Sequence, residues 1–127
     1  MNIRVAHEQG RVPITVFYVD GQINMGSTAQ LEQMARAEYD NGMRDLLIDL
    51  SKASSLTSAG LRTLQVLYRP LDDPSSDASA ARHKSLHLKL LNLPPDLRRV
   101  IQITGFDRFI DIYDDLPTAI TSFGIQD

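Results

Sequence analysis

The sequence contains no cysteine, and this absence excludes several chemistries at once. Without thiols the chain has no disulfide, no thiol nucleophile and no cysteine-based zinc site. It also lacks any apolar run near the ~20 residues that a membrane helix needs. The first residues, MNIRVAHEQGR, lack the apolar core of a signal peptide. We therefore expect a cytoplasmic protein with no membrane partner.

An excess of basic residues is missing as well. Lysine and arginine number 13 against 16 aspartates and glutamates, which gives a formal net charge of −3. A nucleic-acid binder needs a basic face for the phosphate backbone, so no direct nucleic-acid partner is expected. The phosphate-cradling pattern G-x-x-x-x-G-K-[ST] is absent too. We expect neither a nucleotide enzyme nor a cofactor.

The histidines and clustered aspartates do not form a convincing chemical site. His83 and His87 are four residues apart, but the local sequence is a loop turning into a strand, with no third ligand nearby. The aspartates within residues 72–77 lack the regular spacing of a calcium loop. Leu56 occupies the position of the first glycine in a G-x-S-x-G nucleophile elbow around Ser58. The sequence therefore favours neither a metal site nor an enzyme.

Hydrophobic patterning predicts one α/β domain over residues 1–127. Two strands, joined by a hairpin at Gln9-Gly10-Arg11, precede an alternation of helices and strands. Such alternation implies right-handed crossovers and a mainly parallel mixed sheet with about four helices. The expected strands are 3–8, 12–19, 46–50, 86–91 and 109–113, and the expected helices are 27–41, 59–69, 95–104 and 116–123.

The ends of these elements carry recognisable signals. Ser27 or Thr28 can cap the first helix, and Asp115 can cap the last. Gly42 can end the first helix in the left-handed conformation. The segment 70–85, PLDDPSSDASAARHKS, is long for a compact domain and rich in Pro, Ser, Asp and Ala. We interpret it as a flexible loop insertion.

An unusual cluster of hydroxyl side chains lies where the central strand leads into the second helix. The segment 49–62 reads DLSKASSLTSAGLR and contains Ser51, Ser54, Ser55, Thr57 and Ser58. Thr57 or Ser58 can cap the helix by accepting a hydrogen bond from its free N–H groups. The same helix start also tolerates a phosphate, because it presents unpaired donors and a partial positive charge. Capping and phosphorylation are therefore both open for this junction.

The segments 49–51 and 56–62 resemble the signature of STAS domains of the anti-sigma factor antagonist type. The resemblance extends over nearly the whole chain. Residues 18–24, YVDGQIN, look like the family's second strand and the turn after it, and residues 93–113 look like its late helix and strand. It implies a compact sheet with helices packed on it.

The resemblance also implies a function. Ser58 matches the serine that is phosphorylated in this family. There, a serine kinase that is also an anti-sigma factor binds the unphosphorylated antagonist and releases its sigma factor. Phosphorylation frees the kinase to hold sigma again, and a phosphatase resets the switch. The implied partners are therefore such a kinase and a phosphatase.

Two positions around Ser58 depart from the family pattern. Thr57 stands where the family usually has an aspartate, and Asn24 stands where the turn often carries an acidic residue. Thr57 is therefore an alternative phosphate acceptor. We expect Gly60 to allow a close approach at the helix start and Leu61 to anchor the helix. The predicted partner-binding residues are Asp20, Gly21, Gln22, Asn24, Thr57, Ser58, Ala59, Gly60 and Arg62.

Two other functions use the same residues. The chain could be a STAS-like scaffold or transport-accessory subunit in which Ser58 is only a helix cap. It could also be a nucleotide or small-molecule sensor that uses the same helix start.

Overall fold

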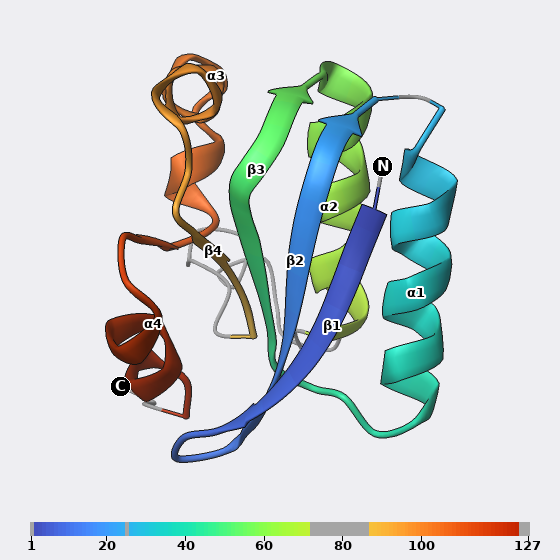
Figure 1. Cartoon of the computed structure of the whole chain (residues 1–127), viewed down its shortest axis with the longest axis vertical. Coiled ribbons are helices and arrows are strands. Elements are labelled where there is room, and N and C mark those ends of the chain that lie inside the picture. The colour runs from blue at the N-terminus through green and yellow to red at the C-terminus, as the bar shows by residue number, and fades with distance from the viewer. Residues whose placement is uncertain (1, 25, 72–86, 125–127) are drawn as a thin grey trace.

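A computed structural model of the chain describes residues 2–24, 26–71 and 87–124, without the side chains of Ser58, Gln65, Val66 and residues 68–71 (Figure 1). Two strands open the fold, and helices then alternate with strands. The elements are β1 (Asn2–Gln9), β2 (Pro13–Ile23), α1 (Thr28–Asp40), β3 (Leu46–Leu56), α2 (Ser58–Leu71), β4 (Leu88–Leu91), α3 (Pro95–Thr104), the 3₁₀ helix η2 (Phe106–Arg108), β5 (Ile112–Tyr113) and α4 (Leu116–Ser122).

The described strands form one mixed sheet in the order β1-β2-β3-β4-β5. β1 and β2 are antiparallel, whereas β3, β4 and β5 each run parallel to the strand before them. This arrangement confirms the predicted α/β fold with an N-terminal hairpin and a mainly parallel sheet. The carboxyl ends of β2 and β3 therefore lie at the same end of the sheet, where the candidate site is found.

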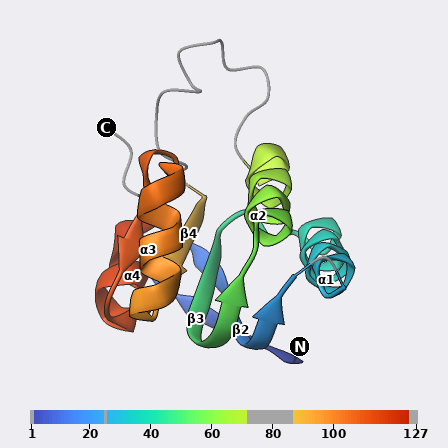
Figure 2. The same cartoon turned by 90° about the horizontal axis from the view of Figure 1, so that it is seen from above.

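Helices cover both faces of the sheet (Figure 2). The larger core joins Phe17 and Ile48 to side chains of α1, α2 and α3, such as Leu31. On the opposite face, Val16 and Leu47 pack with Phe123, which directly follows α4. Neighbouring strand residues point to opposite faces, so a strand covered on both sides has no polar alternation. This double burial explains the unbroken apolar run at 46–48.

Two central strands are longer than the sequence predicts. β2 continues past Asp20-Gly21 to Ile23, and β3 continues past Leu50 to Leu56. Register shifts between Tyr18 and Asp20, and again between Gly21 and Gln22, absorb the irregularity while the pairing goes on. A pairing partner therefore overrides the local turn signal.

The helix ends agree with the sequence signals except at the start of α1. Asp115 accepts a hydrogen bond from the Thr118 amide at 2.9 Å, as predicted for a cap. Gly42 and Gly105 have φ angles of 110° and 76° and follow α1 and α3. Ser27 occupies the N-cap position of α1 but makes no side-chain cap bond. Of the two predicted caps, Ser27 and Thr28, Ser27 makes its side-chain hydrogen bonds within the preceding turn instead.

The other boundaries differ modestly. The strand expected over 109–113 is reduced to Ile112–Tyr113, because Phe109 closes the 3₁₀ helix at 106–108 by donating its amide to the Phe106 carbonyl at 3.0 Å. α2 runs on to Leu71, so the first two residues of the predicted 70–85 loop are helical. The rest of that loop, with His83 and the aspartates of 72–77, lies outside the described residues.

Candidate partner-binding site

Parallel pairing of β2 with β3 brings the two predicted binding segments together. Gln22 lies opposite Ser55 and Ile23 opposite Leu56, so both strands end side by side. The turn after β2 and the first turn of α2 therefore form one surface. We call residues 20–24 and 57–62 the switch surface. Figure 1 shows these two strand ends next to each other at the top of the sheet.

A close backbone contact fixes the two segments relative to each other. The Thr57 amide and the Thr57 hydroxyl both donate to the Ile23 carbonyl, at 3.1 and 3.3 Å. A Cβ on Gly60 would lie 2.8 Å from that same carbonyl oxygen, which is closer than real Cβ contacts. Leu61 is buried in the larger core. These contacts confirm the predicted roles of Gly60 and Leu61.

The helix cap of α2 is Thr57. Its hydroxyl accepts a hydrogen bond from the Gly60 amide at 3.3 Å, and its carbonyl accepts one from the Leu61 amide at 3.0 Å. This is the geometry of an N-cap residue, in which the side-chain oxygen satisfies the third helical amide. Ser58 is the first residue of the helix, one position after the cap. The side chain of Ser58 lies outside the described residues.

The turn after β2 is held by its own side chains. Asn24 Oδ1 accepts from the Gly26 amide at 2.9 Å, and Asn24 Nδ2 donates to Gln22 Oε1 at 3.0 Å. The Ser27 hydroxyl donates to the Gln22 carbonyl at 2.6 Å and accepts from the Asn24 amide at 3.0 Å. Ser27 therefore ties the turn to β2, which is why it does not cap α1. Asn24 preserves the acceptor that a carboxylate would offer and adds a donor.

The switch surface is exposed and carries few fixed charges. Asp20, Gln22, Thr57 and Arg62 are exposed, Gly21, Asn24 and Ala59 are half-buried, and Gly60 is buried. Gly21 has a φ angle of 114°, a conformation that favours glycine. The first turn of α2 contains no acidic residue. Within the described chain, no ion pair holds Asp20 or Arg62, so both charges are available to a partner.

The hydroxyls of the DLSKASSL segment lie on β3 rather than in a loop. β4 pairs with β3 only as far as Asp49. Ser51 and Ser54, which follow, are exposed, and Ser55 is half-buried. Asp49 itself is buried and accepts from the Ser51 amide at 2.8 Å and from Asn92 Nδ2 at 3.3 Å. The serines therefore lie on the part of β3 that extends beyond β4.

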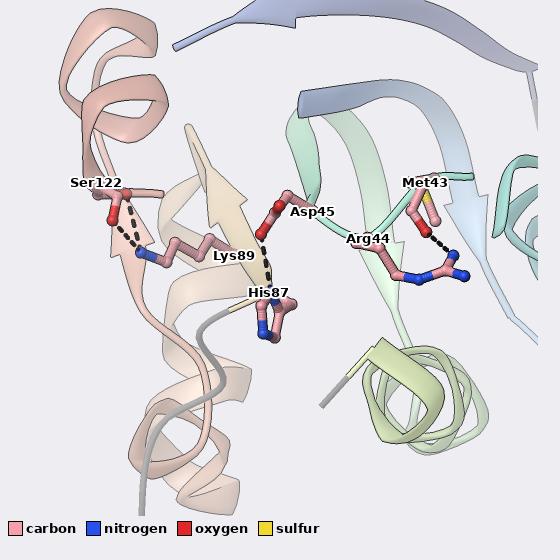
Figure 3. A network of polar contacts seen from close by, with 6 residues as sticks. All are labelled: Met43, Arg44, Asp45, His87, Lys89 and Ser122. Carbon is pink, nitrogen blue, oxygen red and sulfur yellow. Dashed lines mark hydrogen bonds and ion pairs between the residues drawn. The ribbon is translucent and has the colours of Figure 1, made fainter. Parts of the chain in front are cut away.

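A polar network at the other end of the sheet was not predicted (Figure 3). Lys89 is only 4% exposed, and its Nζ donates to the carbonyl and the hydroxyl of Ser122, each at 3.0 Å. Burial lowers the pKa of Lys89, while the carboxylates of Asp111 and Asp45 oppose that shift. His87 Nδ1 lies 2.9 Å from Asp45 Oδ1. The available signal was a lysine inside the otherwise apolar run LHLKLL.

The remaining candidates of the sequence lead elsewhere. His7 lies 2.9 Å from Glu38 on α1 and His87 lies 2.9 Å from Asp45, so each of these two histidines contacts a different carboxylate. Among the residues with described placement, no three potential metal ligands gather. None of the described helices combines the length and the apolar character needed to cross a membrane.

Comparison with known proteins identifies the fold and the family. The sequence pattern of the STAS domain matches residues 4–119. A Bordetella bronchiseptica protein named "Putative anti-sigma factor antagonist BtrV" is 28% identical over 105 residues, which are 83% of this chain and 82% of that protein. The crystal structure of an anti-sigma factor antagonist from Mycobacterium paratuberculosis has a TM-score of 0.72 at 29% identity, covering 95% of this chain and 93% of that one.

The Bacillus cell fate determinant SpoIIAA has the same fold at lower identity. Its phosphorylated form has a TM-score of 0.64 at 15% identity, covering 94% of this chain and 96% of SpoIIAA. Its unphosphorylated form has a TM-score of 0.61, also at 15% identity, with 93% of each chain covered. Because the STAS pattern matches almost all of the chain, the chain belongs to the STAS domain family.

Proposed function

We propose that the chain is an anti-sigma factor antagonist whose partner is a serine-kinase anti-sigma factor. Unphosphorylated chain binds the kinase through the switch surface, and phosphorylation of Ser58 ends the complex. A phosphatase restores the binding form. The relatives carry antagonist names in both the sequence and the structure comparison. They are regulators rather than enzymes, and we place this chain with them in the cytoplasm.

The observation that carries the proposal is that Thr57, and not Ser58, occupies the N-cap position of α2. Thr57 performs the capping, so the helix does not require the Ser58 hydroxyl. The Thr57 hydroxyl is also engaged with Ile23, and a phosphate there would cost the bond that it donates. Ser58 is therefore the better acceptor of the two. Capping by Thr57 also disfavours the alternative in which Ser58 is only a helix cap.

Electrostatics explains why a phosphate would act on the complex rather than on the fold. A phosphoserine adds about −1.5 to −2 charges. A helix start stabilises an anion by about 0.3–1 kcal/mol when exposed, so the domain tolerates it. At an interface, a misplaced charge costs several kcal/mol, and about 2.7 kcal/mol already lowers affinity a hundredfold. SpoIIAA is a relative that has been solved in both phosphorylation states with this fold.

The test is a binding measurement with candidate kinases. We expect Ser58→Ala to bind as the wild type does and Ser58→Asp to bind about a hundredfold more weakly, because only the second adds charge at the interface. The matched control is Thr121→Asp, which places the same charge on the exposed side of α4. Isothermal titration calorimetry gives the dissociation constants. Equal affinity of Ser58→Ala and Ser58→Asp would remove the switch.

A second measurement identifies the acceptor. The chain is incubated with ATP, magnesium and the kinase, and the product is examined by mass spectrometry. We expect a phosphate on Ser58 in the wild type and in Thr57→Ala, and none in Ser58→Ala. Phosphate on Thr57 in the wild type would mean that Thr57, and not Ser58, is the phosphorylated residue.

A further inference from the structure

β1 leaves one edge of the sheet without a partner. It is eight residues long, pairs with β2 on one side, and has no strand on its other side in the described chain. Edge strands are commonly blunted by proline, by a bulge, by being very short, by charged side chains or by a covering helix or loop. β1 contains no proline, its pairing with β2 runs from Asn2 to Gln9 without a register shift, and its charged residues Arg4 and Glu8 have opposite signs. Its outer backbone groups can therefore accept another strand.

The side chains of β1 are divided between the two faces of the sheet. Ala6 packs with the core that α4 covers, whereas Ile3 and Val5 pack with the larger core. Residues two apart along a strand share a face, so Arg4 and Glu8 lie on the same face as Ala6. The Arg4 guanidinium lies 4.3 Å above the Tyr18 ring, which holds it on that face.

Self-pairing of β1 has one register that matches its charges. In an antiparallel pair of identical strands, the numbers of any two opposed residues add up to the same sum. Only every second residue of β1 points its N–H and C=O groups away from β2, so the sum must be even for these groups to face each other. A sum of 12 centres the pairing on Ala6 and places Arg4 opposite Glu8 of the second copy, since 4 + 8 = 12. The symmetry repeats this pair on the other side of the axis. Val5 then lies opposite His7, and no like charges meet.

We propose that β1 is a homodimerisation edge, in which β1 of a second copy adds antiparallel to it about a two-fold axis at Ala6. The two sheets then become one continuous sheet. Backbone hydrogen bonds supply the attraction, and the Arg4–Glu8 pairs select the register. Because the contact is limited to one strand, the dimer is weak and forms as concentration rises.

The dimer leaves the switch surface free. The two-fold axis passes Ala6, which lies opposite Val16 on β2. Asp20 pairs with Asn2, so β1 stands between Asp20 and the second copy, whose hairpin lies beside Asn2 in this register. The switch surface is also formed with β3, on the side of β2 away from β1. Dimerisation and kinase binding are therefore separate properties, and each can fail without the other.

The experiment is sedimentation velocity of the full chain from about 10 μM to about 1 mM, a range suited to small interfaces. We expect the wild type to shift from monomer to dimer across this range. Arg4→Glu and Glu8→Arg each put like charges opposite each other on both sides of the axis, and each should weaken the dimer about tenfold or more. The double variant R4E/E8R exchanges the charges and should restore it.

A mixture of the two single variants tests the proposed register most directly. Neither should dimerise with itself, but the acidic edge of one faces the basic edge of the other, so the mixture should form a heterodimer. Arg36→Glu, an equal charge change on the exposed side of α1, is the control and should dimerise as the wild type does. Circular dichroism checks that each variant folds. A wild type that stays monomeric at 1 mM, or single variants that dimerise normally, would overturn the proposal.

Discussion

The two ends of the sheet hold their polar residues in opposite ways. At the carboxyl end of β2 and β3, the switch surface exposes Asp20 and Arg62 without fixed partners among the described residues. At the other end, Lys89 is buried and both of its hydrogen bonds go to Ser122. Buried charges persist when the protein satisfies them, whereas exposed ones contribute little to stability. The second region therefore serves stability, whereas the exposed charges of the first are those that we propose meet the partner.

The largest effect on stability is expected from substitutions of Lys89. They test whether the buried polar residues at this end of the sheet stabilise the fold. Lys89→Ala removes the ammonium group, which donates to Ser122 and lies 4.8 Å from the centre of the Phe123 ring, and it leaves a void. We expect a loss of about 3 kcal/mol in the free energy of unfolding. Lys89→Met keeps most of the volume and should lose about 1–2 kcal/mol. Urea unfolding of both variants measures these values.

The outcome for the methionine variant decides what the charge contributes. Burying an ammonium group carries a desolvation cost, and apolar replacements of buried charges are sometimes stabilising. A Lys89→Met variant as stable as the wild type would mean that the side chain acts through its volume alone. Kinase binding should be unchanged in either variant, because Lys89 lies at the opposite end of the sheet from the switch surface.

A smaller effect is expected at the switch surface, where capping and signalling are assigned to neighbouring residues. Thr57→Ala removes the acceptor for the Gly60 amide and should cost about 1 kcal/mol of stability, the usual value of an N-cap. Thr57→Ser should retain most of it. Ser58→Ala should leave stability nearly unchanged. If thermal unfolding shows the larger loss for Ser58→Ala, then Ser58 is the cap and the proposed separation of roles is wrong.

The sequence predicts the fold well because its signals are local. Gly42, Gly105 and Asp115 mark helix ends through their own backbone or side-chain chemistry. The apolar strand at 46–48 signals burial on both faces without any knowledge of its neighbours. Residue types alone therefore define most elements of this chain.

Features that depend on distant partners were missed. β2 extends past Asp20-Gly21 because β3 pairs with it there, and no local pattern reports that pairing. Ser27 has the sequence of a cap but bonds the Gln22 carbonyl, which only the folded turn brings within reach. Thr57 and Ser58 were equivalent capping candidates until the position of Gly60 separated them. A motif in the sequence predicts the site, whereas the capping by Thr57 follows only from the folded structure.

The smallest effect is expected at Asp115, at the amino end of α4. Lys89 contacts the other end of this helix through Ser122. Asp115 caps α4, and the backbone and side-chain hydrogen bonds from Thr118 hold the pKa of Asp115 below its usual value of 3.8. A carboxyl whose pKa is lower in the folded state stabilises the fold above the unfolded pKa. That contribution is lost as pH falls from about 3.8 through the lowered pKa. The cap is exposed, so the change is small.

The measurement compares melting temperatures of the wild type and Asp115→Asn between about pH 5 and pH 3. We expect the wild type to be slightly more stable at pH 5 and the two proteins to converge as the carboxyl is protonated. Asp40→Asn, which removes an exposed carboxylate at the end of α1, controls for the loss of negative charge. A constant difference at all pH values would show that the Asp115 carboxylate charge does not stabilise α4. The contacts of Lys89 with Ser122 would then contribute more to the stability of α4 than the charge of Asp115 does.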